Sequence, residues 1–228
     1  MDEAPTLPSV AAPRGGAAGL GSGPAPGPAP TLPAVAAPRP ALSFPPELLL
    51  AARGPGDGVV AAIFDVDGVL TDGRVYIGES GETFKAFSTL DGQGLKLLAQ
   101  AGIVPLVVTG RDSPAVRRRV ADLGLQHAAY GADDKLAAAN ALLSALGIDW
   151  SRVAVMGDDW PDLPLMRHAA FACAPPGAHV EVRARARHVT TARAGYGAAR
   201  EFCDLLLVAT GRYAALLDGP QRALDGAR

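Results

Sequence analysis

The chain has 228 residues, of which 49% are hydrophobic and 19% are charged, and its formal net charge is -2. The length allows one sizeable domain with additional segments, and the balanced charge gives no electrostatic reason to expect nucleic acid or an anionic membrane as a partner. The two cysteines have no paired spacing, which argues against a disulfide scaffold. The sequence has no apolar run of membrane-spanning length, and MDEAPTLPS lacks the features of a signal peptide, so we expect a cytoplasmic protein.

The first part of the chain is rich in alanine, proline and glycine. Thirteen of the 20 prolines precede Gly58, and large apolar residues are too few to offset the entropy of ordering such a segment. We therefore expect a disordered extension at 1–57, a folded domain at 58–217 and a tail at 218–228. In the extension, TLPSVAAPRG recurs as TLPAVAAPRP, either as a docking motif used twice or as low-complexity drift. SFPPELLLAAR, residues 43–53, has the prolines and apolar residues of a short helix.

From Val59 onward, short apolar runs alternate with helical stretches, a pattern typical of parallel strands joined by crossover helices. We predict strands at 59–64, 103–109, 127–130 and 152–157, and helices at 92–101, 114–123 and 135–146. Apolar residues on both sides of Gly78-Glu79-Ser80-Gly81 indicate a β-hairpin that can overhang the loop after the first strand. The expected fold is an α/β, Rossmann-like open parallel sheet with helices on both faces and a hairpin inserted after strand one.

Polar residues gather where the predicted strands end. In an open parallel sheet, ligands bind outside the carboxyl ends of the strands, so these residues should meet at one edge. Carboxylates that lie so near to one another repel unless a cation or a proton neutralises them. Hard oxygen ligands of this kind favour Mg²⁺. The residues that we expect at this edge are Asp65, Asp67, Thr109, Gly110, Arg111, Lys135, Asp158, Asp159 and Asp162.

The same edge has positive elements for an anion. Lys135 and the start of the helix near Ser113 and Pro114, with Ser113 as N-cap, are placed to receive a phosphoryl group. Two carboxylates two residues apart suit phosphoryl transfer through a covalent carboxylate. In this interpretation Asp65 attacks phosphorus, while Asp67 gives a proton to the leaving alkoxide and later activates the attacking water.

These segments resemble a known family. DVDGVLTDG, TGR, the lysine after GADD, and GDDWPDLPLM look like the four motifs of the haloacid dehalogenase (HAD) superfamily. More narrowly, the hairpin, FSTLDGQGLKLL and GYGAAREFCDLLL resemble its capless phosphatases of 3-deoxy-D-manno-octulosonate 8-phosphate, over about 59–213. The resemblance implies a Mg²⁺-dependent phosphomonoesterase of lipopolysaccharide precursor synthesis, working through an aspartyl phosphate. It also implies a homotetramer in which hairpins of neighbouring subunits help close each site.

The resemblance also assigns roles by position. Asp65 would be the nucleophile and a metal ligand, Asp67 the acid/base whose backbone carbonyl also binds Mg²⁺, and Asp158 the other metal ligand. Thr109 and Lys135 would hold the phosphoryl oxygens.

Further roles concern the surroundings of the ion and the sugar. Asp159 and Asp162 would orient the metal-bound waters and the lysine. The residues implied to face the phosphorylated sugar acid are Asp67, Ser88, Thr89, Leu90, Asp91, Gly92, Lys96, Gly110, Arg111, Arg119 and Lys135. Two positions depart from the family pattern: Lys96 stands where arginine is expected, and the tail reads Ala194-Gly195-Tyr196-Gly197 where relatives show a glycine pair and an arginine.

Several alternatives stay open. A nonulosonate 9-phosphate phosphatase or a broader sugar-phosphate phosphatase would share every catalytic residue. A non-catalytic scaffold whose Pro-rich arm recruits partners would predict degraded catalytic positions, yet all of them are present. Arg119 is interpreted equally as a substrate contact or as part of a solvated helix face, and Lys85 as a surface residue. Arg183, Arg185 and Arg187 alternate as on a strand or extended loop.

Overall fold

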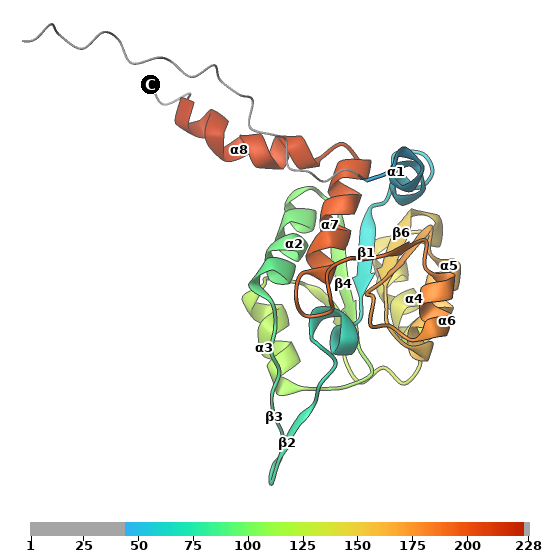
Figure 1. Ribbon diagram of the computed structural model, residues 1–228, viewed down its shortest axis with the longest axis vertical. Helices are drawn as coiled ribbons and strands as arrows, with labels where there is room; N and C mark the ends of the chain where they lie inside the picture. Colours follow the sequence, from blue (N-terminus) through green and yellow to red (C-terminus); the bar gives the residue numbers. More distant parts are fainter. Residues whose placement is uncertain (1–43, 226–228) are drawn as a thin grey trace, which may run out of the picture. The chain divides into compact units, whose positions relative to one another are not determined.

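The computed structural model of the chain describes residues 44–225. Within this part, the centre is a parallel sheet of six strands in the order β5-β4-β1-β6-β7-β8 (Figure 1). The strands are β1 (Ala61–Phe64), β4 (Val104–Val108), β5 (His127–Ala129), β6 (Val153–Met156), β7 (Phe171–Ala174) and β8 (His188–Val189). The predicted open parallel α/β sheet is confirmed, while the repeated TLPxVAAPR segment lies outside the described residues.

Strand β1 lies in the middle of the sheet. Ala61 is in register with Val104 of β4 on one side and with Val153 of β6 on the other. Every residue of β1, β6 and β7 is buried, because a parallel sheet covered on both faces needs apolar side chains on both. The four predicted strands are present with slightly shorter ends, and β7 and β8 extend the sheet beyond the prediction.

Helices cover both faces of the sheet (Figure 1). One face carries α1 (Pro46–Arg53), α2 (Thr89–Gln100), α3 (Pro114–Asp122) and α7 (Ala198–Ala209), and the other carries α4 (Lys135–Leu146), α5 (Leu163–His168) and α6 (Val180–Arg185). Under α7, the ring of Phe202 lies 5.5 Å from that of Phe64 and 6.3 Å from that of Phe171. Burying three aromatic side chains in one cluster is a large contribution to the core.

The folded unit extends past both expected boundaries. Helix α1 confirms the short helix predicted within 43–53, and its Ala52 is fully buried in the core beside α7. The packed unit therefore begins before residue 58. At the other end, α8 (Tyr213–Asp225) continues beyond residue 217, and its Tyr213 and Leu216 pack against the core.

The predicted β-hairpin is confirmed. Strands β2 (Tyr76–Gly78) and β3 (Gly81–Phe84) pair antiparallel, and the rings of Tyr76 and Phe84 stack with centroids 4.3 Å apart. In Figure 1 the hairpin projects from the domain at the bottom of the view. Ile77 and Phe84 are exposed, at 68% and 54%. A lone two-stranded hairpin has little stability of its own, so its attachment at the root matters.

One predicted element is wrong. Arg183 and Arg185 belong to the short helix α6 rather than to a strand or extended loop, because Val182 anchors that helix in the core while the arginines point outward. Within residues 44–225, no helix combines the length and the apolar character that crossing a membrane requires.

Candidate active site

The site lies where the strand order reverses. The chain leaves β1 towards β4 on one side, whereas it leaves β6 towards β7 on the other. Such a switch point opens a crevice at the carboxyl ends of the two strands. Here it forms a cavity of about 380 Å³. All residues that the sequence placed at this edge line it: Asp65, Asp67, Thr109, Gly110, Arg111, Lys135, Asp158, Asp159 and Asp162.

A tight turn after β1 presents the acidic residues. Asp65 follows the strand directly, and the apolar side chains of Val66, Val69 and Leu70 are buried, which fixes the turn to the core. Gly68 has φ 99°, a conformation that favours glycine, and a Cβ there would overlap the Asp158 carboxylate. The loops after β1 and β6 can therefore approach closely only because residue 68 lacks a side chain.

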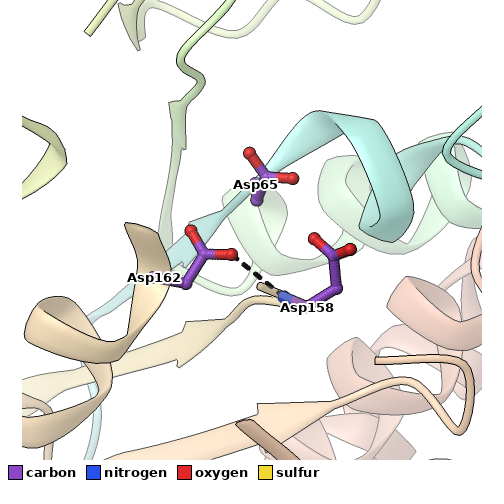
Figure 2. A group of neighbouring side chains, drawn as sticks. All are labelled: Asp65, Asp158 and Asp162. Carbon is purple, nitrogen blue, oxygen red and sulfur yellow. Dashed lines mark hydrogen bonds between the residues drawn. The ribbon is translucent and has the colours of Figure 1, made fainter. Parts of the chain in front are cut away.

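Three aspartates form the centre of the site. One carboxylate oxygen each of Asp65, Asp158 and Asp162 lies within 4.8 Å of the others, and Figure 2 shows the three side chains converging. Lys135 Nζ lies 2.6 Å from Asp65 Oδ1 and 2.7 Å from Asp162 Oδ1. Oδ2 of Asp162 accepts a hydrogen bond from the amide of Asp158 at 3.0 Å (Figure 2). The same oxygen accepts one from the amide of Asp159 at 3.3 Å. Both carboxylate oxygens of Asp162 are therefore already paired with groups of the protein.

The cluster carries excess negative charge, since three carboxylates face one ammonium. Burial and the charge of Asp162 raise the pKa of Asp65 to about 7, although Lys135 opposes the shift. Burial and the charges of Asp65 and Asp162 raise the pKa of Asp158 to about 8. Burial alone would lower the pKa of Lys135, but the two neighbouring carboxylates outweigh it and raise that pKa. Lys135 therefore stays charged at neutral pH, while the acids require protons or a cation.

The donor set fits a hard divalent cation. Its ligands would all be oxygens, and a bound cation replaces the protons that the raised pKa values demand. Asp65 and Asp158 have oxygens to spare, whereas Asp162 does not. The side chains are close enough together to share one ion, as Figure 2 shows.

The loop after β4 forms one wall of the cavity. Thr109 is buried, and its hydroxyl accepts a hydrogen bond from the Arg111 amide at 3.4 Å. Ser113 takes the predicted N-cap position of α3, but its hydroxyl donates to Glu82 and makes no capping hydrogen bond. The predicted cap is therefore right in position and wrong in its hydrogen bond.

The structure corrects the interpretation of Lys85. Its side chain is completely buried at the root of the hairpin, with Nζ 2.5 Å from Asp67 Oδ1 and 3.3 Å from Glu82 Oε2. Arg111 Nε lies 3.9 Å from Asp67 Oδ2 and 3.8 Å from Glu82 Oε2. We call Asp67, Glu82, Lys85, Arg111 and Ser113 the hairpin-root network. No local pattern in the sequence marks this network: at the end of β3 the structure exposes Phe84 and buries Lys85.

Several residues expected to face the sugar lie outside the cavity of one chain. Arg119 donates to the Ser88 carbonyl at 3.0 Å and lies over the Phe87 ring. Asp91 is buried and accepts hydrogen bonds from the amides of Gly197, at 3.2 Å, and Arg200, at 2.8 Å. The residues not brought into the cavity are Ser88, Thr89, Leu90, Asp91, Gly92, Lys96 and Arg119.

The tail segment packs against the loop after β1. The Gly195 amide donates to the Val69 carbonyl at 3.2 Å, and a Cβ on Gly195 would lie 2.7 Å from the Asp72 nitrogen. Gly195 also has φ 70°. Tyr196, which stands at the departure from the family pattern, is 67% exposed. Glycine at 195 therefore allows the tail to touch the loop that carries the acidic residues.

Comparison with known proteins agrees with this architecture. Residues 130–202 match the family described as haloacid dehalogenase-like hydrolase, and the fold and cavity define the same class. The chain is 43% identical over 150 residues to "3-deoxy-D-manno-octulosonate 8-phosphate phosphatase KdsC" of Escherichia coli (strain K12). The aligned region covers 66% of this chain and 80% of that protein. The chain therefore belongs to the KdsC family of HAD phosphatases and is a phosphoric monoester hydrolase.

Solved structures share the fold. The phosphatase from Moraxella catarrhalis, in complex with magnesium ion, phosphate ion and a KDO molecule, is 40% identical with a TM-score of 0.71, covering 76% of this chain and 97% of that one. The cobalt-bound phosphatase from Haemophilus influenzae is 38% identical with a TM-score of 0.68, covering 70% of this chain and 93% of that one. Both relatives hold a divalent metal.

Proposed function

We propose that this phosphatase uses Mg²⁺ to hydrolyse 3-deoxy-D-manno-octulosonate 8-phosphate to the free sugar acid and phosphate, through an aspartyl phosphate. The observation that carries the proposal is the cluster of the buried Asp65 and Asp162 with the half-buried Asp158, whose negative charge Lys135 only partly balances. Relatives of this chain carry that substrate in their names, and one was solved with magnesium, phosphate and KDO. The reaction belongs to lipopolysaccharide precursor synthesis in the cytoplasm.

The metal would be held by Asp65, Asp158 and the backbone carbonyl of Asp67. When bound, Mg²⁺ supplies positive charge for the phosphoryl oxygens and keeps the acids ionised. Asp162 supports the site from behind, because it fixes Lys135 and the amides of the loop after β6.

Asp65 acts as the nucleophile. Lys135 engages its Oδ1, so Oδ2 is the oxygen left to form the bond to phosphorus. The phosphoryl oxygens would meet Lys135, the Thr109 hydroxyl and the amide of Gly110, all of which line the cavity. These groups stabilise the charge that spreads over the phosphoryl oxygens in the transition state.

Asp67 acts as the general acid and then as the general base. It protonates the alkoxide as the ester P–O bond breaks, and it takes a proton from the water that later attacks the aspartyl phosphate. Arg111, whose side chain is 52% exposed at the rim of the cavity, is placed to meet the anionic sugar acid.

The predicted sugar-binding residues that lie outside the cavity are proposed to act at the site of a neighbouring subunit. Ser88, Thr89, Leu90, Lys96 and Arg119 would face the sugar acid of a neighbouring site in a homotetramer, whereas Asp91 and Gly92 are buried within their own chain. The exposed Ile77 and Phe84 on a projecting hairpin support such an assembly, because a chain gains by burying apolar surface of this kind. Light scattering coupled to size exclusion tests it, and a monomer at catalytic concentrations would contradict it.

A substrate panel tests the proposed reaction. We expect kcat/KM for 3-deoxy-D-manno-octulosonate 8-phosphate to exceed that for nonulosonate 9-phosphates and for glucose 6-phosphate by roughly 100-fold, about the discrimination that a few site-specific polar contacts provide. Comparable values across the panel would favour the broader sugar-phosphate phosphatase instead. Each substrate should be run with and without Mg²⁺.

The N-terminal extension is proposed to be dispensable for turnover. Because α1 packs in the core, the informative truncation starts at residue 44 rather than 58. Unchanged kcat/KM in this shortened chain would agree with the proposal, whereas a loss of activity would assign the proline-rich arm a part in the enzyme.

A further inference from the structure

Lys85 is a buried cation that the proposed reaction has not used. It follows β3 at the root of the hairpin, and none of its side-chain surface is exposed. Its Nζ lies 2.5 Å from Asp67 Oδ1. A lysine enclosed in this way cannot reach a substrate in the cavity, so any effect on catalysis must pass through the groups that it touches.

The two carboxylate oxygens of Asp67 have different surroundings. Oδ1 receives Lys85, and the Thr71 hydroxyl lies 3.5 Å from it. Oδ2 is buried, and among the described residues no donor makes a hydrogen bond to it. The nearest cation recorded there, Arg111 Nε, is 3.9 Å away, beyond hydrogen-bond distance. A buried oxygen without a partner is costly and is usually kept for a purpose.

Lys85 is held in place from its other side. Glu82 lies 3.3 Å from its Nζ, and the Ser113 hydroxyl at the start of α3 donates to Glu82. The contacts therefore join the hairpin, the turn after β1 and the loop before α3. Within the hairpin-root network, two carboxylates face two cations, so Lys85 has no need of an added ion to stay paired.

We propose that Lys85 is a positioning residue for proton transfer by Asp67. By engaging Oδ1, it fixes the orientation of the carboxyl group that carries and accepts the proton. As the ester P–O bond breaks and phosphorus becomes bonded to Asp65, the proton on Asp67 passes to the leaving oxygen, and the resulting carboxylate stays paired with Lys85. In the second step water loses a proton to Asp67 and attacks phosphorus, the bond between phosphorus and Asp65 breaks, and phosphate leaves, which restores both carboxyl groups. This inference rests on the proposed function.

A purely structural role makes a different prediction. If Lys85 only fastened the hairpin, its loss would slow every substrate by a similar factor. If it acts through Asp67, its loss should slow most the substrates whose leaving group needs a proton. A p-nitrophenyl ester expels a stable phenolate and needs little protonation, whereas a primary alkyl phosphate expels a strongly basic alkoxide.

The experiment compares kcat/KM for p-nitrophenyl phosphate and for a primary alkyl phosphate in Lys85→Met, which keeps the length and removes the charge. We expect the alkyl ester to lose about 10-fold more activity than the aryl ester, within the range that general acid catalysis contributes. Lys85→Arg, which restores a cation, should recover part of that difference. As a control, Arg118→Met removes one exposed charge from α3, and it should leave the ratio of the two kcat/KM values unchanged.

Equal losses on both esters would overturn the inference, and so would full activity in Lys85→Met. If that variant does not fold, Glu82→Gln, which loosens the other anchor of Lys85, should shift the ratio in the same direction by a smaller factor. The ratio does not depend on the natural sugar. A substrate panel without preference for the octulosonate ester would therefore refute the proposed substrate. The ratio of kcat/KM for the alkyl and aryl esters would still test the role of Lys85.

Discussion

Two groups of ionisable side chains meet in the turn after β1, and their charges are arranged in opposite ways. The aspartate cluster sets Asp65, Asp158 and Asp162 against Lys135 alone, and the pKa of Asp65 and of Asp158 is raised. The hairpin-root network pairs its carboxylates with two cations. There, the hydrogen bond from Ser113 lowers the pKa of Glu82, and Lys85 adds to the effect against burial.

The two groups differ in whether they need an added ion. The aspartate cluster is electrostatically incomplete until a cation binds, whereas the hairpin-root network is satisfied by the chain itself. Two residues along one turn, Asp65 and Asp67, thus face different surroundings. That separation suits a nucleophile beside a metal and a proton carrier beside a lysine.

The strongest way to break the aspartate cluster is Asp65→Asn. We expect kcat to fall by roughly 10⁴-fold or more, because the variant removes the attacking charge with little change in volume. Steady-state phosphate release measures the loss, and circular dichroism should show an unchanged fold. Asp122→Asn, at an exposed surface pair, is the matched control. Residual turnover near that of the control would rule out the covalent route.

Removing the metal is the second test. Treatment with EDTA should abolish turnover, and added Mg²⁺ should restore it, because the ion supplies charge at the phosphoryl oxygens. Binding to the folded state also stabilises it, so Mg²⁺ at about 100 times its Kd should add about 2.7 kcal/mol to the free energy of unfolding. Thermal unfolding with and without Mg²⁺ measures this effect. Asp158→Asn should lose most of the response, and an intact response in that variant would move the ion elsewhere.

The stability of the metal-free protein should depend on pH through the aspartate cluster. A carboxyl group whose pKa is raised on folding stabilises the protein when protonated, and that stability is lost as the pH rises through the folded value. For metal-free protein we therefore expect the free energy of unfolding to fall between about pH 4 and pH 8, because the pKa values of Asp65 and Asp158 are raised to about 7 and about 8. A loss of several kcal/mol is expected. Urea unfolding at several pH values measures the slope, which saturating Mg²⁺ should flatten; a flat curve without metal would contradict the charge imbalance.

The smallest effect should come from the balanced group. Glu82→Gln keeps a hydrogen-bond partner for Ser113 and removes one charge from a network that spans the hairpin root. We expect a loss of about 1 kcal/mol in the free energy of unfolding, of the order of one hydrogen bond. Chemical denaturation with Mg²⁺ present isolates this change. A loss as large as that for a buried unpaired charge would mean that the network is less balanced than its geometry indicates.

Much of the site could be predicted because topology alone assembles it. Asp65, Thr109 and Asp158 each follow a parallel strand at its carboxyl end, so the cavity needed only correct strands to be inferred. The strands β7 and β8 were not predicted because one has only four residues, three of them small, and the other has two residues. Nothing local marks them as strands, since their burial comes from neighbours in the sheet.

The errors at Lys85 and Ser113 have one physical origin, which is contact between residues far apart in sequence. Lys85 reads as a surface residue until the turn at Asp67, 18 residues earlier, encloses it. Ser113 has the local features of a helix cap, yet Glu82, 31 residues away, takes its hydroxyl. Local patterns describe what a side chain can do within its own element, and they do not say which distant group will compete for it.

The contact between Gly195 and the turn after β1 has a practical consequence for anyone who redesigns this protein. Residue 195 has no room for a side chain, because even a methyl group would press on the backbone at Thr71 and Asp72. An affinity tag, graft or stapled insertion between Thr190 and Gly197 would therefore be felt at the reaction centre. The safer attachment points are those that leave this glycine and its approach to the turn as they are.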